Sequence, residues 1–186
     1  MKILSIDAET NGLYGQIFAI GGIYKDTISG EEIRYSKRVS IVEDVNPWVA
    51  ENVLPHVQDI EQLDKTVDDD VYGVEKTLLK DFRDFYLECK KKTGNNFDLL
   101  VIGHMVCPVE ANLFIKMKNY ELIGDFEGPF PLHDVASMLL MAGENTTSVD
   151  IYVEKHKLEN TEGSIHNPLF DCEQALKVFI HLSGEK

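Results

Sequence analysis

The first part of the chain carries hydrophobic runs of strand length, separated by short polar turns. Residues 2–6 (KILSI) are mostly apolar and β-branched, which predicts a buried strand. A turn at Asn11-Gly12 separates this run from a second one at 16–24, and residues 32–42 alternate well enough to form a third strand. The pattern therefore predicts a three-stranded antiparallel meander.

Farther along, the apolar spacing changes to that of helices. From Gly73 onwards, apolar residues recur three and four positions apart, which predicts an amphipathic helix ending near the lysines at 90–92. The continuous apolar run at 98–103 predicts another strand, and the acidic segment 59–70 predicts a loop with one turn of helix. Further helices are predicted at 46–52 with Asn46 as cap, from Pro108, at 135–142 with Asp134 as cap, from Thr147 to His156, and at 168–182.

Strands that come first and helices that then alternate with strands are typical of a mixed α/β fold. We expect a mixed sheet of about five strands flanked by helices. No internal repeat and no convincing linker divides the sequence, so residues 1–186 are expected to form a single domain.

The composition is that of a domain that can fold without disulfide bonds or a structural metal. Of the 186 residues, 44% are hydrophobic, which is enough to bury a core. The cysteines Cys89, Cys107 and Cys172 are widely separated, which predicts reduced core thiols instead of disulfides or a zinc site. No stretch reaches the ~18 apolar residues of a membrane helix, and an acid follows the first six residues, which is untypical of a signal peptide. We expect a cytoplasmic protein without membrane contact.

The charge balance restricts how this chain can bind nucleic acid. Its 18 basic and 32 acidic residues give a formal net charge of −14. Proteins that grip long nucleic acids by neutralising phosphates usually show a basic face. Any nucleic-acid role must therefore depend on local groups or on bound cations.

Two carboxylates follow the first predicted strand, in the segment Asp7-Ala8-Glu9-Thr10. In an extended chain, residues two positions apart point to the same side, so Asp7 and Glu9 would lie together. Neighbouring like charges are costly unless a cation lies between them. The segment indicates a cation site, and an acidic turn at the end of the strand is the other interpretation left open.

Two later segments place an acidic residue at the start of a predicted helix. Glu110 lies in the first turn of the helix that begins at Pro108. Asp171 lies in the first turn of the last helix, and His166 precedes that helix on a loop. Acids at such positions also suit the positive end of the helix dipole, so each segment taken singly is explained as an ordinary helix start.

Taken together, the three segments resemble the DEDD family of 3'-to-5' exonucleases, which are DnaQ-like and have a ribonuclease H-like fold. The first motif of that family, Asp-x-Glu-Thr after the first strand, matches residues 7–10. The third motif of its histidine branch, His-x4-Asp, matches His166 and Asp171. The second motif departs from the family, because Glu110 stands where Asp is usual and His104 lies one residue farther back.

The resemblance implies a ribonuclease H-like fold and hydrolysis of terminal phosphodiesters, with release of nucleoside 5'-monophosphates. Two divalent cations, Mg²⁺ or Mn²⁺, would lie roughly 3.5 to 4 Å apart, one activating the attacking water and the other stabilising the leaving 3'-oxygen. Their expected ligands are Asp7, Glu9, Glu110 and Asp171. His166 and Glu9 are the expected catalytic residues, with His166 taking the proton from the water.

The resemblance also implies that the terminal nucleotide is received at Thr10, Asn11, Gly12 and Leu13. The acidity favours the 3' end of single-stranded DNA or RNA, or a short oligonucleotide, as substrate. Two alternatives remain open: a nucleic-acid-binding or scaffold module with a weakened site, and a small-molecule phosphodiesterase. A homodimer, as in several relatives, and a basic protein partner are both compatible with the negative surface.

Overall fold

The computed structural model describes residues 1–63, 70–94, 98–158 and 163–184. Within these ranges the chain forms a five-stranded sheet of order β3-β2-β1-β4-β5, in which β1, β2 and β3 form an antiparallel meander and β4 and β5 run parallel to β1. The strands are β1 (Lys2–Thr10), β2 (Ile17–Asp26), β3 (Glu32–Arg38), β4 (Leu99–Gly103) and β5 (Leu132–Asp134). The predicted mixed five-stranded α/β fold is confirmed.

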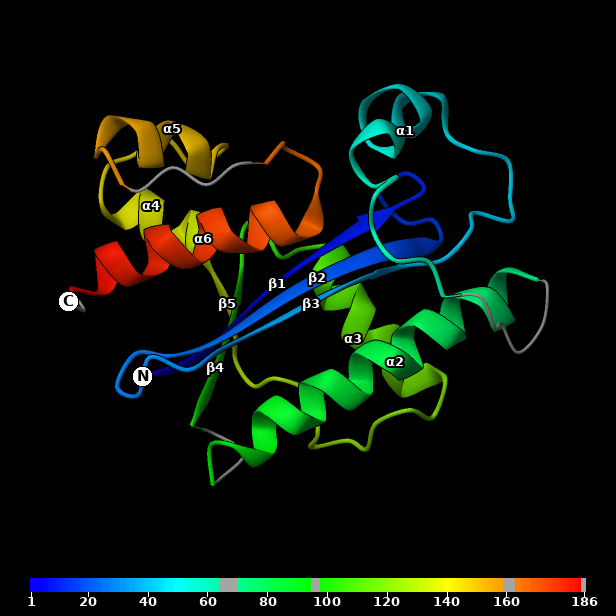
Figure 1. Cartoon of the computed structure of the whole chain (residues 1–186), viewed down its shortest axis with the longest axis horizontal. Coiled ribbons are helices and arrows are strands. Elements are labelled where there is room, and N and C mark those ends of the chain that lie inside the picture. Colours follow the sequence, from blue (N-terminus) through cyan, green and yellow to red (C-terminus); the bar gives the residue numbers. More distant parts are fainter. Residues whose placement is uncertain (64–69, 95–97, 159–162, 185–186) are drawn as a thin grey trace.

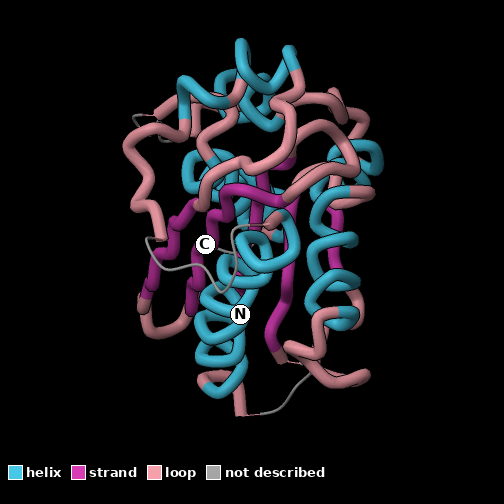
Figure 2. Tube along the Cα trace, turned by 90° about the vertical axis from the view of Figure 1, so that its right-hand side faces the viewer, coloured by secondary structure: helices cyan, strands magenta, loops and turns pink. Residues whose placement is uncertain are grey.

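Helices cover both faces of this sheet. One hydrophobic cluster joins one face of the sheet to α2 and α3, and a second joins the opposite face to α4, α5 and α6. Figure 1 shows these two groups of helices, and the turned view in Figure 2 shows helices in front of and beside the strands. The helices are α1 (Pro47–Asn52), α2 (Val71–Lys91), α3 (Val109–Asn119), α4 (Val135–Met141), α5 (Val149–Lys155) and α6 (Pro168–Ser183), with a 3-10 turn η1 (Leu54–His56).

The alternation of side chains along β1 decides which residues face α6. Leu4 and Ile6 belong to the cluster on the α2 and α3 side, whereas Ile3 belongs to the cluster that contains α6. Ser5 also faces α6, because its hydroxyl donates to the carbonyl of Cys172 at 2.8 Å. Since successive side chains alternate, the odd-numbered Asp7 and Glu9 point to the α6 side as well.

Gly21 allows the first turn of α6 to approach the sheet closely. In the sheet register Gly21 of β2 lies opposite Asp7 of β1. A Cβ atom at this position would lie 2.4 Å from the carbonyl carbon of Pro168 and 2.7 Å from the backbone nitrogen of Leu169. Only glycine fits beneath the helix here, and this close approach brings the start of α6 to Asp7.

Several helix caps agree with the sequence prediction. Asn46 caps α1, with its side chain accepting from the backbone of Trp48 and Val49, and Asp134 caps α4 by accepting from Ala136. Asp70 caps α2, which begins at Val71, two residues before the predicted start. Asn46 and Asp134 could be predicted as caps because a cap is formed by a hydrogen bond between its side chain and the backbone two or three residues ahead.

Other expectations need correction. β1 continues to Thr10, so Asp7 and Glu9 lie inside the strand and not beyond its end, and β3 ends at Arg38 instead of residue 42. The short strand β5 occupies 132–134, a segment for which no strand was predicted. Ser148, and not Thr147, caps α5 by accepting from the backbone of Ile151.

Two further expectations concern the cysteines and the acidic loop. Cys89 and Cys172 are free and buried, but Cys107 is exposed, so it is not a core thiol. In the acidic loop, positions 64–69 lie outside the described residues, and residues 59–63 contain no helix. Among the helices described, none combines the length and the apolar character needed to span a membrane.

Candidate active site

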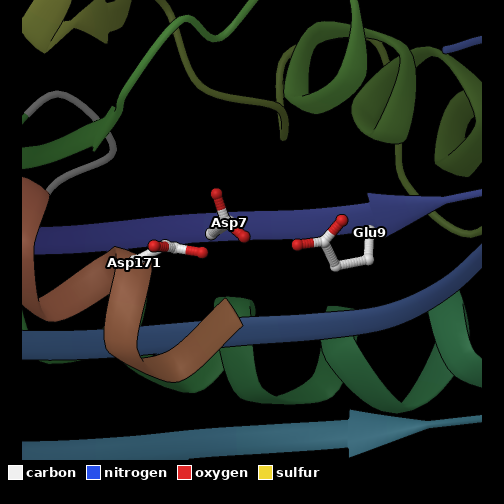
Figure 3. Close-up of side chains that lie close together, drawn as sticks. All are labelled: Asp7, Glu9 and Asp171. Atoms are coloured by element: carbon white, nitrogen blue, oxygen red, sulfur yellow. The ribbon is translucent and has the colours of Figure 1, made fainter. Parts of the chain in front are cut away.

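Three carboxylates from two elements converge beside the sheet. Asp7 and Glu9 come from β1, and Asp171 comes from the first turn of α6. One oxygen of each side chain lies within 4.8 Å of an oxygen of the other two. Figure 3 shows Asp171 and Glu9 on either side of Asp7, each directing oxygens toward it. All three side chains are partly buried, so they share a restricted and partly dry space.

The loop before α6 holds His166 next to this group. Its Nδ1 lies 3.5 Å from Oε1 of Glu9, and its backbone nitrogen donates to Oδ2 of Asp171 at 2.8 Å. The backbone of His166 has φ of 68°, in the left-handed region that non-glycine residues adopt at some cost. Asn167 fixes the following helix start by accepting from the backbone of Leu169 and Phe170. The bond to Asp171 thus stabilises a backbone conformation that brings the imidazole to Glu9.

Glu110 lies in the same cavity but is held differently from the other three acids. It comes from the first turn of α3, is buried, and its Oε1 accepts from the backbone nitrogen of Ala8 at 3.1 Å. Its oxygens are not part of the group in which Asp7, Glu9 and Asp171 lie within 4.8 Å of one another. The carboxylate of Glu110 therefore bonds to β1 and lies outside the group formed by Asp7, Glu9 and Asp171.

The cavity between these residues has a volume of about 440 Å³. Acidic and histidine side chains line it together with small and apolar ones, and no Lys or Arg from the described parts of the chain is among them. The polar groups that reach it are Asp7, Glu9, Glu110, Asp150, Asp171, His104, His166, Thr147 and Ser148. Within the described lining, His104 and His166 are the side chains that could carry a positive charge to balance the carboxylates.

Burial raises the pKa of all four acids, and repulsion from neighbouring carboxylates raises it further for Asp7, Glu110 and Asp171. Burial is the main cause throughout, and it raises the pKa of Asp171 to about 7 and that of Glu110 to about 8. The pKa of Asp7 lies well above its usual range, because burial is reinforced by the charges of Asp171, Glu9 and Glu110. Burial raises the pKa of Glu9 as well, although the hydrogen bond from His166 opposes this, and the same bond raises the pKa of His166.

These features fit a divalent cation. Mg²⁺ binds oxygen ligands at about 2.0 to 2.1 Å, so its ligands lie at most about 4.2 Å apart. The oxygens of Asp7, Glu9 and Asp171 are already within 4.8 Å of one another, so small side-chain rotations bring them to bonding positions. A bound cation would also favour the ionised carboxylates and so remove the repulsion that raises their pKa values.

The residues expected to receive a nucleotide lie at the end of β1 and in the turn that follows it, and their side chains differ in exposure and in hydrogen bonding. Leu13 is exposed, whereas Asn11 is buried. The amide of Asn11 donates to Glu43 and to the carbonyl of Asp44, and its oxygen accepts from the backbone of Asn46. Gly12 adopts φ of 78°, which is the positive value that glycine tolerates, and Thr10 ends β1. The side chain of Asn11 is thus occupied by the loop that leads into α1.

Two residues beside the cavity have no distinguishing signal in the sequence. Asp150, in the first turn of α5, lines the cavity, and its buried Oδ1 has no hydrogen-bond partner in the described part of the chain. Trp48 of α1 contacts the ring of His166, with 5.4 Å between ring centres and an interplanar angle of 87°. Neither residue belongs to a recognisable motif, because both reach the site through tertiary packing.

Comparison with known proteins identifies relatives in fold. No protein-family model and no curated protein matches the sequence. Among solved structures, the chain is similar to Exonuclease X in complex with 5' overhanging duplex DNA, with a TM-score of 0.57, 18% identity and coverage of 98% of this chain and 91% of that one. It is also similar to a full-length 3'-exonuclease, with a TM-score of 0.60, 15% identity and coverage of 98% of this chain. The chain spans 60% of the length of the second protein.

At these identities the likeness shows a shared fold, and it agrees with the predicted ribonuclease H-like architecture.

Proposed function

We propose that this protein is a metal-dependent 3'-to-5' exonuclease that hydrolyses the terminal phosphodiester of single-stranded nucleic acid or of short oligonucleotides. The observation that carries the proposal is the convergence of Asp7, Glu9 and Asp171 within 4.8 Å, with His166 at 3.5 Å from Glu9. The exonuclease fold of the structural neighbours supports it.

Each residue has a role that follows from its position. Asp7, Glu9 and Asp171 would hold divalent cations, with Glu110 as the more distant fourth acid. When bound, Mg²⁺ or Mn²⁺ supplies the positive charge that meets the phosphate and acidifies the attacking water. Because Nδ1 of His166 is turned to Glu9, Nε2 is the nitrogen that would accept the proton from that water. The hydrogen bond with Glu9, helped by the charge of that carboxylate, raises the pKa of His166 and so makes it a stronger base.

The electrostatics of the cavity favour a small or single-stranded substrate. The chain has a net charge of −14, and no Lys or Arg lines the described part of the cavity. Extended contact with duplex requires many phosphate contacts from basic side chains. One strand end that enters a cavity of about 440 Å³ needs far fewer.

The proposal is tested with 5'-labelled single-stranded DNA and the matching RNA, each incubated with Mg²⁺, with Mn²⁺ and with EDTA. We expect a ladder of products that shortens from the 3' end, requires the metal, and disappears in Asp7→Asn. Ala142→Ser on the exposed surface beyond α4 is the matched control and should keep full activity. Folded wild-type protein that leaves both substrates intact under all conditions would contradict the proposal.

Two other functions are each favoured by one observation on the cavity. The separation of Glu110 from the other acids favours a binding module in which the site no longer turns over. Such a module would bind Mn²⁺ without cleaving either substrate. The absence of basic residues from the described cavity lining suits a small-molecule phosphodiesterase, for which the rate would fall as the oligonucleotide becomes longer.

A further inference from the structure

The cavity continues beyond the three clustered carboxylates, past Asp171. Asp171 and Glu9 lie on either side of Asp7 (Figure 3), and Asp150 is close enough to Asp171 that its charge adds to burial in raising the pKa of Asp171. The start of α6, which carries Asp171, lies between α1 and α5 in Figure 1. We call the part of the cavity next to α5 the α5 end, and its polar lining residues are His104, Thr147, Ser148 and Asp150.

Asp150 offers a hydrogen-bond acceptor at this end for which the protein supplies no donor. Its Oδ1 is buried and has no partner among the described residues. The side chain lines the cavity but is not one of the three that lie within 4.8 Å of one another. An acceptor buried without a donor costs about 1 to 3 kcal/mol. Rotation about the last side-chain bond exchanges the two carboxylate oxygens, so either can turn to a donor in the cavity.

The neighbours of Asp150 restrict what this end can bind. Nε2 of His104 lies 2.9 Å from the carbonyl oxygen of Thr146, so this nitrogen carries the proton and Nδ1 of the neutral ring is an acceptor. The hydroxyl of Thr147 donates to Oδ1 of Asn145 at 2.8 Å. A phosphate, which is negatively charged and only accepts, is repelled by Asp150. The α5 end therefore suits an uncharged group that donates a hydrogen bond.

The in-line geometry of the reaction decides which part of a strand lies there. His166 contacts Glu9, so the attacking water is expected on the Glu9 side of the cluster. In an in-line displacement the leaving 3'-oxygen departs on the opposite side, which is the side of Asp171 and Asp150. The penultimate nucleotide carries this oxygen. Its sugar has a 2'-hydroxyl in RNA and none in DNA, and this hydroxyl donates whatever the base is.

We infer that Asp150 accepts a hydrogen bond from the 2'-hydroxyl of the penultimate nucleotide, and that this contact makes RNA the preferred substrate. The inference rests on the proposed function, since it concerns the substrate of the same site. Asp150 binds the sugar and takes no part in the proton transfer.

Single changes of the sugar test the contact. The probes are four 5'-labelled oligoribonucleotides: unmodified, 2'-deoxy at the penultimate position, 2'-fluoro at that position, and 2'-deoxy at the terminal position. A 2'-fluoro sugar keeps a ribose-like pucker but cannot donate. We expect kcat/KM for release of the first nucleotide to fall about 10-fold with either penultimate change and to change little with the terminal one.

Variants of Asp150 assign this preference to its carboxylate. In Asp150→Ala the ratio of kcat/KM between the unmodified and the penultimate 2'-deoxy substrate should fall from about 10 to about 1. In Asp150→Asn the amide oxygen still accepts, so a ratio of about 3 is expected. Glu154→Ala, at an exposed acid of α5 that does not line the cavity, is the control and should keep the ratio of wild type. Because the ratio is taken within one variant, a general loss of active protein cancels.

Three results would overturn the inference. An Asp150→Ala protein that keeps the wild-type ratio would show that another group reads the sugar. A preference carried by the terminal sugar would place the wrong nucleotide at the α5 end. Loss of a bound Mn²⁺ in Asp150→Ala would show that Asp150 is a cation ligand.

Binding without cleavage separates this inference from the proposed function. Calorimetric titration in Ca²⁺ compares a 5'-phosphorylated diadenosine dinucleotide with the same dinucleotide carrying 2'-deoxyribose in its 5' nucleotide. If wild-type protein cleaves strand ends but binds both dinucleotides alike, the contact fails and the exonuclease stands. If wild type binds the ribose form about 10-fold tighter, Asp150→Ala binds both alike and no oligonucleotide is cleaved, the contact stands and the exonuclease fails.

Discussion

Asp7 lies at the centre of the acidic cluster, between Glu9 of its own strand and Asp171 of α6. Its pKa is raised by burial and by three neighbouring carboxylates, so ionised Asp7 is unfavourable without a cation. Asp7→Asn removes this charge and one metal ligand. We expect the variant, in EDTA at neutral pH, to melt at least as high as wild type, and Mn²⁺ to raise its Tm much less than it raises that of wild type.

Differential scanning calorimetry with and without Mn²⁺ checks this expectation. Asp44→Asn, in the loop before α1 and outside the cavity lining, is a control that removes an equal charge. A wild-type Tm that ignores Mn²⁺, or an Asp7→Asn variant that responds as strongly as wild type, would contradict the assignment of Asp7 as a ligand.

The raised pKa values also predict how stability changes with pH in the absence of metal. The pKa values of Asp171, about 7, and Glu110, about 8, lie above those of the same groups in the unfolded chain. Between pH 4 and 8 the native state therefore holds more protons than the unfolded state, so stability falls as pH rises. His166 contributes in the same direction, because its pKa is raised and its protonated form is stabilised by Glu9.

We expect the free energy of unfolding in EDTA to decrease from pH 5 to pH 8 by an amount on the order of a few kcal/mol. Urea unfolding at several pH values measures it. Adding Mg²⁺ should weaken the decrease, because the cation favours the ionised acids. A free energy of unfolding that rises over this pH range in EDTA would show that the ionised carboxylates do not destabilise the folded state.

Glu110 is the site residue whose role the sequence leaves most open. Its carboxylate accepts from the backbone of Ala8, and the shorter side chain of Glu110→Asp is expected to lose this bond. We expect Glu110→Asp to change the rate of nucleotide release without abolishing it, and Glu110→Ala to lower that rate by 10-fold or more. Single-turnover assays check both variants. Undiminished turnover in Glu110→Ala would remove this residue from the site.

Among single residues, those in the motifs could be identified from the sequence, but the groups that contact them in the folded protein could not. The spacing of Asp7 and Glu9 along an extended strand already places both carboxylates on one side. The bond from Ala8 to Glu110, the buried Oδ1 of Asp150 and the contact between Trp48 and His166 join segments far apart in the chain. No local pattern encodes such contacts.

At the scale of elements, the approach of α6 to β2 determines whether the cluster forms. Gly21→Ala would place a Cβ atom 2.4 Å from the backbone of Pro168, and backbone cannot rotate away as a side chain does. We expect this substitution to cost about 1 to 3 kcal/mol of stability and to weaken Mn²⁺ binding by displacing Asp171 from Asp7.

Gly22→Ala is the matched control, because the three atoms nearest to its added Cβ all belong to the side chain of Phe85, the closest at 2.7 Å, and a side chain can move aside. Equilibrium unfolding and Mn²⁺ titration of both variants provide the comparison. If Gly21→Ala binds Mn²⁺ as wild type does, the close approach of α6 is not needed for the site.

The elements that could be predicted are those specified locally. Asn46 before Pro47 and Asp134 before Val135 mark helix starts through their own hydrogen bonds, and the structure confirms both. β5 is only three residues long and exists through its pairing with β4, so it has no strand-length pattern of its own. Ser148 and Thr147 are both good caps, and the choice between them depends on how α5 packs.

At the scale of the whole molecule, we expect the binding of nucleic acid to depend only weakly on salt concentration. The net charge is −14, and the described cavity lining has no basic side chains. If about one phosphate is neutralised per bound single strand, affinity should fall only about threefold between 50 and 200 mM salt. Measuring KM for a single-stranded 20-mer at several salt concentrations, with the metal held constant, tests this. A fall of a hundredfold or more would reveal a basic binding surface elsewhere on the chain.

The chemistry proposed for this molecule depends on one physical property, the ability of Asp7, Glu9 and Asp171 to bind a divalent cation together. Titration of the wild-type protein with Mn²⁺, with free Mn²⁺ followed by electron paramagnetic resonance, measures it directly. We predict at least one Mn²⁺ per chain for wild type, competition by Mg²⁺, and loss of this binding in both Asp7→Asn and Asp171→Asn. Folded wild-type protein that binds no Mn²⁺ at millimolar concentrations would contradict the metal site and the nuclease that depends on it.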